Sequence, residues 1–353
     1  MKGAARLAAS ADTGAIAAVV ARAAYTALRR YPPGGAKTWS RTNHRGEPVT
    51  LLEGPAVTAG AVTGQVVAAA VAARRTVSGA PLPEQPERVR VPLGRNDLAL
   101  TVAGLGGAAF GVLDDLRGSA KRRGLRGHLG ALAHGEVTTG TVKLAGLAVT
   151  GLAAALLEGG EPADVAINAG LVAGGANLLN LFDLRPGRAI KVAALAATGI
   201  AASSVSRAGA RLTGLQAVAA PAGAALGLLP EDLRERAMLG DAGANALGAM
   251  LGAAAAHALP RGARAGVLAG IVALTVASEK VSFTKVIAAT PPLNWFDMLG
   301  RRPPGSQTLA DLVPAQSGRR QPGRHRREET KEHRSRSGSW FSYFFKTVTR
   351  REP

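Results

Sequence analysis

The sequence predicts an all-α protein, a polytopic integral membrane helical bundle with about nine to ten transmembrane helices. Three observations favour this fold class: charge-free segments recur along the chain, several of them have no polar face, and basic residues gather in the loops between them. A soluble bundle needs polar helix faces at a period near 3.6 residues. Without such faces it would expose large apolar patches.

The predicted helices are eight charge-free segments and a weaker ninth at the N-terminal end, in which Arg22 must reach the interface or face protein. In order, they cover Thr13 to Leu28, Gly54 to Ala73, Leu98 to Leu113, Leu144 to Leu157, Val165 to Phe182, Val192 to Ser206, Leu212 to Pro230, Ala242 to Pro260 and Ala265 to Ser278. Small residues four apart predict close helix contacts. These pairs are Gly107 with Gly111, Gly170 with Gly174, and Gly248 with Gly252.

The chain has 43 Lys and Arg against 24 Asp and Glu, and the excess lies in short loops and in the tail after Arg301. A nucleic-acid binder usually concentrates such charge on one face of a folded domain, so no nucleic acid is expected as a partner. The absence of Cys excludes disulfides and Cys-ligated zinc.

The distribution of Lys and Arg also predicts orientation. Loops after odd-numbered helices are mostly basic, whereas the loop Glu158–Asp164 has no Lys or Arg. The loop from Arg74 to Asp97 is a counterexample. The balance places the ends of odd helices in the cytoplasm, with the N-terminus outside. We therefore expect a multi-pass protein of the cell membrane with a cytoplasmic tail.

Two domains follow from this reading. Residues 1–300 form the membrane-embedded part with its cytoplasmic loops, and residues 301–353 form a basic, largely disordered tail. The tail ends in an aromatic cluster, Trp340 to Lys346, that suits a membrane interface. Its basic residues would be drawn to anionic lipid, although an extension without function would have the same composition.

Three polar clusters fall at helix ends, and counting helices places all of them on the basic, cytoplasmic side. They are Asp114 with Asp115, then Asn177, Asn180 and Asp183, then Asp241. Asp241 could simply cap a helix, and the Asn residues could bond between helices. Asp114 and Asp115 end a helix, where the macrodipole disfavours negative charge, so a bound cation or a nearby Arg would explain them better.

Carboxylate and amide oxygens suit Mg²⁺, which usually keeps waters and bridges substrate phosphates. The basic side chains of Lys143, Arg126 and Arg188 are candidates for binding phosphate oxygens. A carboxylate pair can also act as a base or orient a nucleophile. Together, the clusters favour a metal and phosphate site on the cytoplasmic side.

The motifs FGVLDDLRG, NLLNLFD and MLGDAGANALG, in that order, resemble the polyprenyl-phosphate N-acetylhexosamine-1-phosphate transferase family. The resemblance covers roughly residues 41–300, since RTNHRGEPVTLLEGPA sits where that family has its first cytoplasmic loop. Such enzymes transfer a sugar-1-phosphate from a UDP-sugar to an undecaprenyl-type phosphate, with Mg²⁺ and release of UMP. The phospho-N-acetylmuramoyl-pentapeptide transferases of peptidoglycan synthesis belong to the family.

The resemblance implies roles for individual residues. Asp241 would ligate the metal together with Asp115, and Asp114 or Asp115 would be catalytic, activating or positioning the lipid phosphate. A second set of residues, Asn177, Asn180, Asp183 and Lys143, would bind substrate. The implied partners are a polyprenyl phosphate and a UDP-N-acetylhexosamine-type donor, and a homodimer is left open.

The chain also departs from the family pattern. The second Asp expected after Asp183 is replaced by Pro186, a serine is replaced by Ala244, and the loop after Ser278 contains no His. Two alternatives therefore stay open: a non-catalytic scaffold or lipid-phosphate-binding homologue, and a transporter, because polar groups inside a bundle also mark solute pathways.

Overall fold

The computed structural model describes residues 2–77, 93–117, 130, 134–135, 137–205 and 213–303. The predicted tail from residue 304 onward, including its aromatic cluster, lies outside these residues, and so does Arg126. The description below concerns the unit formed by residues 1–304.

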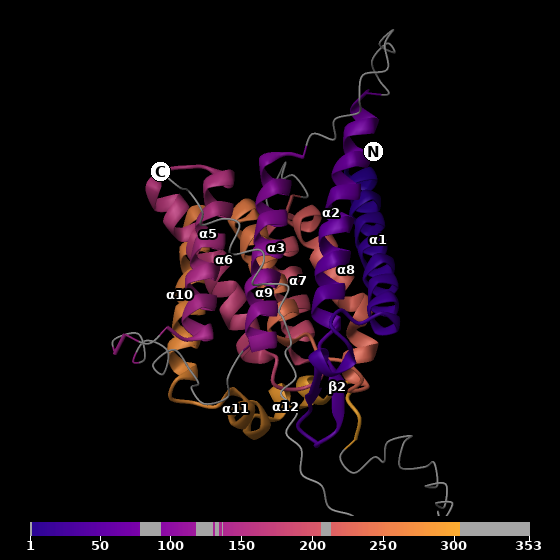
Figure 1. Cartoon of the computed structure of the whole chain (residues 1–353). Helices are drawn as coiled ribbons and strands as arrows, with labels where there is room; N and C mark the ends of the chain where they lie inside the picture. Colours follow the sequence, from indigo (N-terminus) through magenta and orange to yellow (C-terminus); the bar gives the residue numbers. More distant parts are fainter. Residues whose placement is uncertain are drawn as a thin grey trace, which may run out of the picture. The chain divides into compact units, whose positions relative to one another are not determined.

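Each of the nine predicted apolar segments coincides with a long helix (Figure 1). Their bounds are α1 (Lys2–Arg30), α2 (Glu53–Val77), α3 (Arg95–Arg117), α5 (Thr139–Glu158), α6 (Pro162–Phe182), α7 (Arg188–Val205), α8 (Thr213–Leu233), α9 (Gly240–Ala258) and α10 (Arg261–Ser278). Two short helices follow, α11 (Phe283–Ala289) and α12 (Pro291–Met298). The all-α prediction is confirmed.

Within the described residues, six helices are long and apolar enough to cross a membrane: α1, α2, α3, α5, α6 and α10. This supports a membrane protein, whereas the number of nine to ten spans stays a prediction. Arg22 remains exposed, and its guanidinium donates to the carbonyl oxygen of Gly227 in α8 at 3.2 Å.

Helix α9 is the centre of the bundle and packs against α2, α3, α6, α7 and α8. Its residues from Ala242 to Ala256 are buried without exception. Gly and Ala dominate α9, so neighbouring backbones come close. A Cβ added at Gly107 of α3 would lie 2.7 Å from the carbonyl oxygen of Asn245. Gly248 meets the backbone of Gly175 in α6 in the same way, which confirms close backbone contact for the pairs Gly107 with Gly111 and Gly248 with Gly252. Gly170 and Gly174 instead meet the side chains of Leu268 and Ile271 in α10.

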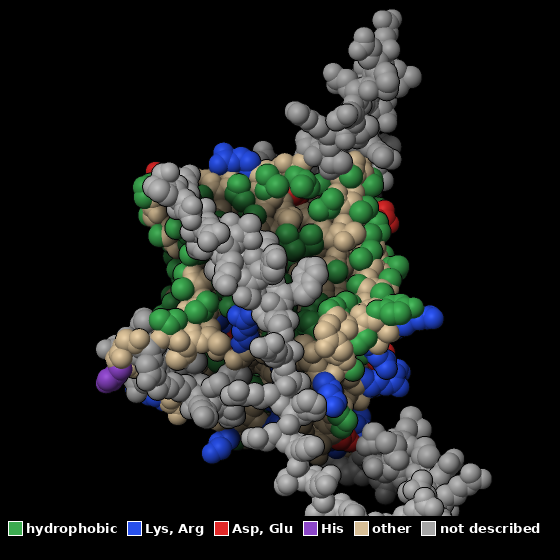
Figure 2. Space-filling model, in the orientation of Figure 1, with side chains coloured by type: hydrophobic (Ala, Val, Ile, Leu, Met, Phe, Trp, Pro, Cys, Tyr) green, Lys and Arg blue, Asp and Glu red, His purple; other side chains and the backbone are tan. Residues whose placement is uncertain are grey.

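The loops at one end of the bundle form a polar layer. A two-stranded antiparallel sheet of β1 (Ser40–Thr42) and β2 (Pro48–Thr50) lies there with α11 and α12, whereas the N-terminus lies at the opposite end (Figure 1). Figure 2 shows hydrophobic side chains over the helices and most of the visible Lys and Arg side chains toward the end with the sheet. We call this end the basic end.

Candidate functional site: carboxylates around Lys143 and the start of α9

Lys143, in the first turn of α5, joins two of the predicted acidic clusters. Its ammonium donates to Asp114 Oδ2 at 3.1 Å and to Asp241 Oδ2 at 2.5 Å. The two carboxylates also lie within hydrogen-bonding reach of each other. One lysine faces two adjacent carboxylates, so the group carries a net negative charge when both acids are ionised. The ends of α3, α5 and α9 therefore converge on one charged centre.

Asp115, the other member of the pair, caps α9 from outside that helix. Its carboxylate accepts the backbone N–H groups of Asp241 at 3.1 Å and of Ala242 at 2.9 Å. Leu239 stands at the N-cap position and offers no side-chain acceptor. The start of α9 stabilises negative charge, and this offsets the unfavourable position of Asp115 at the end of α3. Arg41 adds positive charge nearby, because it bonds the backbone carbonyl of Asp115.

Asp183 lies directly after α6 and approaches the same helix start. The backbone amide of Gly240 donates to its carboxylate, but Oδ2 has no hydrogen-bond partner in the described structure. Burial holds the pKa of Asp183 well above its usual range, and the negative charges of Asp232, Asp241 and Asp115 raise it further. The predicted convergence of Asp115, Asp183 and Asp241 on one side is thus present in the fold.

Asn177 and Asn180 are half-buried on α6. Within the described residues, neither side chain takes part in a hydrogen bond or ion pair. The backbone carbonyl of Asn180 accepts the N–H of Asp183 at 3.1 Å, which fixes the turn after α6. Their role as substrate-binding residues stays a prediction. Arg188, which we considered for phosphate, is instead buried against Asp297, with distances of 2.7 and 2.9 Å between nitrogen and oxygen.

Two acidic residues that we did not single out belong to this region. Glu53 at the start of α2 is fully buried, and neither carboxylate oxygen has a partner in the described structure. Asp232 near the end of α8 is 2 % exposed with an unpartnered Oδ2, and it lies close enough to Glu53 and Asp183 for electrostatic interaction. Counting helices places both residues on the basic side, so the same argument could have found them.

A cavity of about 160 Å³ opens beside this second group of carboxylates. Asp183 and Asp232 line its inner side, and His44, Arg185 and Glu235 line the rest. Burial and the charge of Arg185 lower the pKa of His44. The cavity therefore combines buried carboxylates with Arg185 and with His44, whose Nδ1 lies 3.9 Å from Glu235 Oε2.

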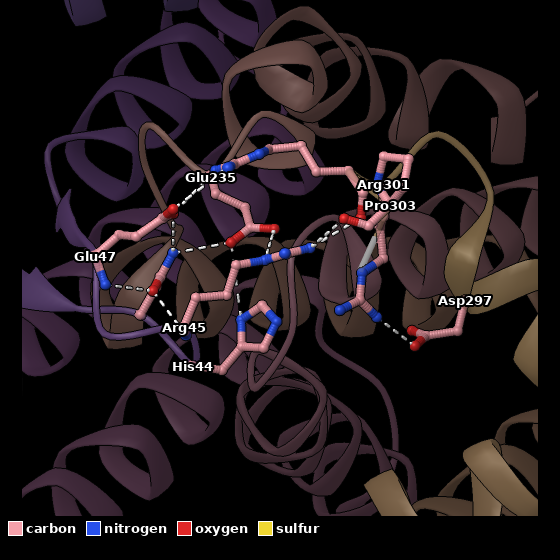
Figure 3. Close-up of polar contacts among 9 residues, drawn as sticks. His44, Arg45, Glu47, Glu235, Asp297, Arg301 and Pro303 are labelled. Carbon is pink, nitrogen blue, oxygen red and sulfur yellow. Dashed lines mark hydrogen bonds and ion pairs between the residues drawn. The ribbon is translucent and has the colours of Figure 1, made fainter. Parts of the chain in front are cut away.

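An ionic network lies beside this cavity and includes Glu235 of its lining (Figure 3). Arg45 Nε lies 2.9 Å from Glu235 Oε1, and its terminal nitrogen donates to the carbonyl oxygen of Arg302 at 2.9 Å. Arg302 pairs with Glu47 at 2.9 Å, and Arg301 pairs with Asp297 at 2.7 Å. The hairpin, the α8–α9 loop and the segment after α12 are thereby joined at the basic end.

Glu235 adopts a backbone conformation that only this network makes tolerable. Its φ of 59° is in the left-handed region, which is unfavourable for a residue with a Cβ. Asn43 donates to its Oε2 at 2.8 Å and Arg45 binds its Oε1. The bonds to Asn43 and Arg45 therefore hold Glu235 in its strained backbone conformation.

The donor atoms near Lys143 fit a magnesium ion in its usual manner of binding. Within the described residues, no group of three or more His, Asp or Glu side chains is arranged to hold a metal alone. Mg²⁺ commonly takes only one or two protein carboxylates and completes its octahedron with water and substrate phosphate. Asp114 and Asp241 supply such a pair, and their side chains remain 20 % and 24 % exposed.

An apolar cavity of about 570 Å³ lies between α6, α7, α9 and α10. Its walls are aliphatic side chains and glycines, such as Leu171, Ile200, Leu251 and Ile271. Gly248 and Gly252 of α9 also line it, so the cavity runs along the helix whose first turn carries Asp241. Such a wall suits an alkyl or prenyl chain.

In comparisons with known proteins, no family model and no curated protein matches this chain.

Proposed function

We propose that the chain is a Mg²⁺-dependent phosphosugar transferase acting on a polyprenyl phosphate at the basic end of the bundle. The observation that carries the proposal is the contact of Lys143 with both Asp114 and Asp241. We infer that the two carboxylates, which come from different helices, would hold a divalent ion and that the lysine beside them would bind phosphate oxygens. The apolar walls of the large cavity along α9 suit the lipid chain.

In the proposed reaction, an oxygen of the polyprenyl phosphate attacks the phosphorus that bears the sugar of a UDP-sugar. A new P–O bond forms at that phosphorus, its bond to the bridging oxygen of the pyrophosphate breaks, and UMP leaves with the bridging oxygen. The bound Mg²⁺ would neutralise charge on the phosphoryl oxygens. Lys143 contributes a second positive charge to the same oxygens.

The acidic residues divide between binding and positioning. Asp241 and Asp114 would ligate the ion, because both carboxylates face Lys143 at a partly exposed surface. Asp115 uses both carboxylate oxygens to fix the start of α9, so we assign it a positioning role. The role of Asp115 as a metal ligand stays a prediction. Asp183 would bind the donor beside the cavity of His44 and Arg185.

The location and orientation of the protein, the role of its tail and the process it serves follow from the same proposal. We place the protein in the cell membrane with the basic end in the cytoplasm, so that the donor comes from water and the lipid from the bilayer. The tail would contact anionic lipid. Cell-envelope polysaccharide or peptidoglycan precursor synthesis is the process that consumes such a product.

A direct assay tests this function. Purified full-length protein in detergent is mixed with undecaprenyl phosphate, Mg²⁺ and each of a panel of UDP-sugars, and released UMP is measured. We expect release that falls at least about a hundredfold in Asp241→Asn and Asp114→Asn, with Glu161→Gln at the opposite end as the control. No release with any donor would favour the scaffold, and solute uptake by proteoliposomes without UMP would favour the transporter.

A further inference from the structure

A second polar cavity, of about 340 Å³, lies at the end of the bundle opposite the carboxylate site. It is enclosed by the first half of α1, the middle of α2, and the ends of α3, α8 and α9 that lie away from the basic end. None of the residues of the proposed transferase site lines it. Its chemistry therefore needs a separate explanation.

Asp97 and Gln65 form the polar wall of this cavity. Gln65 Nε2 donates to Asp97 Oδ1 at 2.5 Å, and the backbone amide of Gly94 donates to Asp97 Oδ2 at 3.1 Å. Asn96 and His257 lie beside them, with 3.1 Å between the amide nitrogen and ring Nε2. Both oxygens of Asp97 are fixed by donors, so its carboxylate is held in one orientation.

Gln65 also carries an acceptor with no partner. Its side chain lines the cavity and the residue is only 6 % exposed, yet Oε1 makes no hydrogen bond in the described structure. A buried amide oxygen without a donor destabilises the fold, because it has lost its hydrogen bonds to water. Because Asp97 fixes the amide nitrogen, Oε1 cannot exchange places with it. The cavity is thus missing a hydrogen-bond donor.

The charge of the lining residues indicates which kind of hydrogen-bond donor would bind in the cavity. Asp12 and Asp97 contribute two carboxylates, and no Lys or Arg is among the described residues that line the cavity. The ligand should therefore be a cation with several N–H or O–H groups. The volume equals about ten water molecules, which is too roomy for one desolvated metal ion but fits an organic cation.

We propose that this cavity binds a primary aliphatic amine. An ammonium group carries three donors and one positive charge, and it can satisfy Gln65 Oε1 while it pairs with Asp97. Asp12 provides further negative charge, and Ile16, Ala68, Ala69 and Leu100 offer apolar walls for the carbon chain. This site is independent of the transferase proposal.

Putrescine is a suitable probe because it is a primary aliphatic amine. Butanediol has the same length without charge and serves as its control. We expect putrescine to raise the melting temperature of the full-length protein in detergent at near-neutral pH, and butanediol at the same concentration to leave it unchanged. NaCl at matched ionic strength controls for general screening. Isothermal titration then gives the dissociation constant.

The variants Asp97→Asn and Asp12→Asn should each weaken putrescine binding about tenfold or more. Glu161→Gln removes a carboxylate at the same end but outside the cavity, and it should bind like the parent. Asp12 is exposed, so Asp12→Asn tests the site even where Asp97→Asn fails to fold. Equal binding of butanediol, unchanged affinity in Asp12→Asn, or tighter binding of Mg²⁺ that displaces putrescine would each overturn the proposal.

Discussion

Asp115 at the end of α3 accepts the backbone N–H of Asp241 at 3.1 Å and so fixes the end of one helix against the start of another. Because Asp241 also binds Lys143 of α5 at 2.5 Å, the position of its carboxylate depends on two neighbouring helices. The geometry of the proposed site therefore depends on α3 and α5 as much as on α9.

Removing the cap should loosen this arrangement. Asp115→Ala leaves the N–H groups of Asp241 and Ala242 without an acceptor, and we expect a loss of about 1–2 kcal/mol of stability. Asp115→Asn keeps one acceptor oxygen and should lose less. Thermal unfolding in detergent measures both. Equal stability of Asp115→Ala and the parent protein would show that the cap does not stabilise α9.

Replacing Lys143 should affect stability and metal dependence together. Lys143→Met leaves Asp114 and Asp241 adjacent with no neutralising charge, which we expect to cost on the order of 2 kcal/mol because both acids are partly exposed. Added Mg²⁺ should restore more stability to this variant than to the parent, and UMP release should stay lost. Lys37→Gln, an exposed lysine at the basic end, is the matched control.

A methyl group at a helix contact should separate α3 from α9. In Gly107→Ala the new Cβ would lie 2.7 Å from the carbonyl oxygen of Asn245 and 3.0 Å from Cα of Ala246. Both atoms belong to backbone, so we expect a destabilisation of about 1–3 kcal/mol. Gly266→Ala in α10 meets no atom within 4 Å and should be neutral or stabilising. Melting temperatures of the two variants in the opposite order would contradict the packing described here.

Asp183 should make stability depend on pH in the absence of metal. Its pKa is raised by burial and by neighbouring carboxylates, so the fold favours the protonated form. The stability that Asp183 contributes is therefore complete at low pH and is lost as pH rises through the raised pKa. Melting temperatures measured from about pH 5 to about pH 9 should fall more steeply for the parent than for Asp183→Asn. Parallel curves would mean that Asp183 is already ionised in the fold.

The sequence predicted the helices well because eight of the nine apolar segments lack charge and the segments end at basic or polar loops. It also placed Asp114, Asp115 and Asp241 on one side, since counting helices determines the side on which each loop lies. The glycine pairs could also be predicted from the sequence, because their spacing follows the helical period.

Contacts between helices could not be predicted in this way. The spacing of Asp115 along α3 gave no sign that its carboxylate caps α9, and Arg188 turned toward Asp297, about a hundred residues away. Glu53 stands alone at the start of α2, and Asp232 lies in a run of charged residues from Glu231 to Arg236, so the sequence pattern singled out neither of them. Only the packing of α2, α6 and α8 around α9 brings them near Asp183.

Binding of Mn²⁺, followed by electron paramagnetic resonance as a substitute for Mg²⁺, tests the central claim most directly. The account predicts one Mn²⁺ per chain, displaced by Mg²⁺, with affinity reduced at least about tenfold in Asp241→Asn and in Asp114→Asn but not in Glu161→Gln. Mn²⁺ affinity that is the same in all four proteins would contradict a metal site between Asp114 and Asp241.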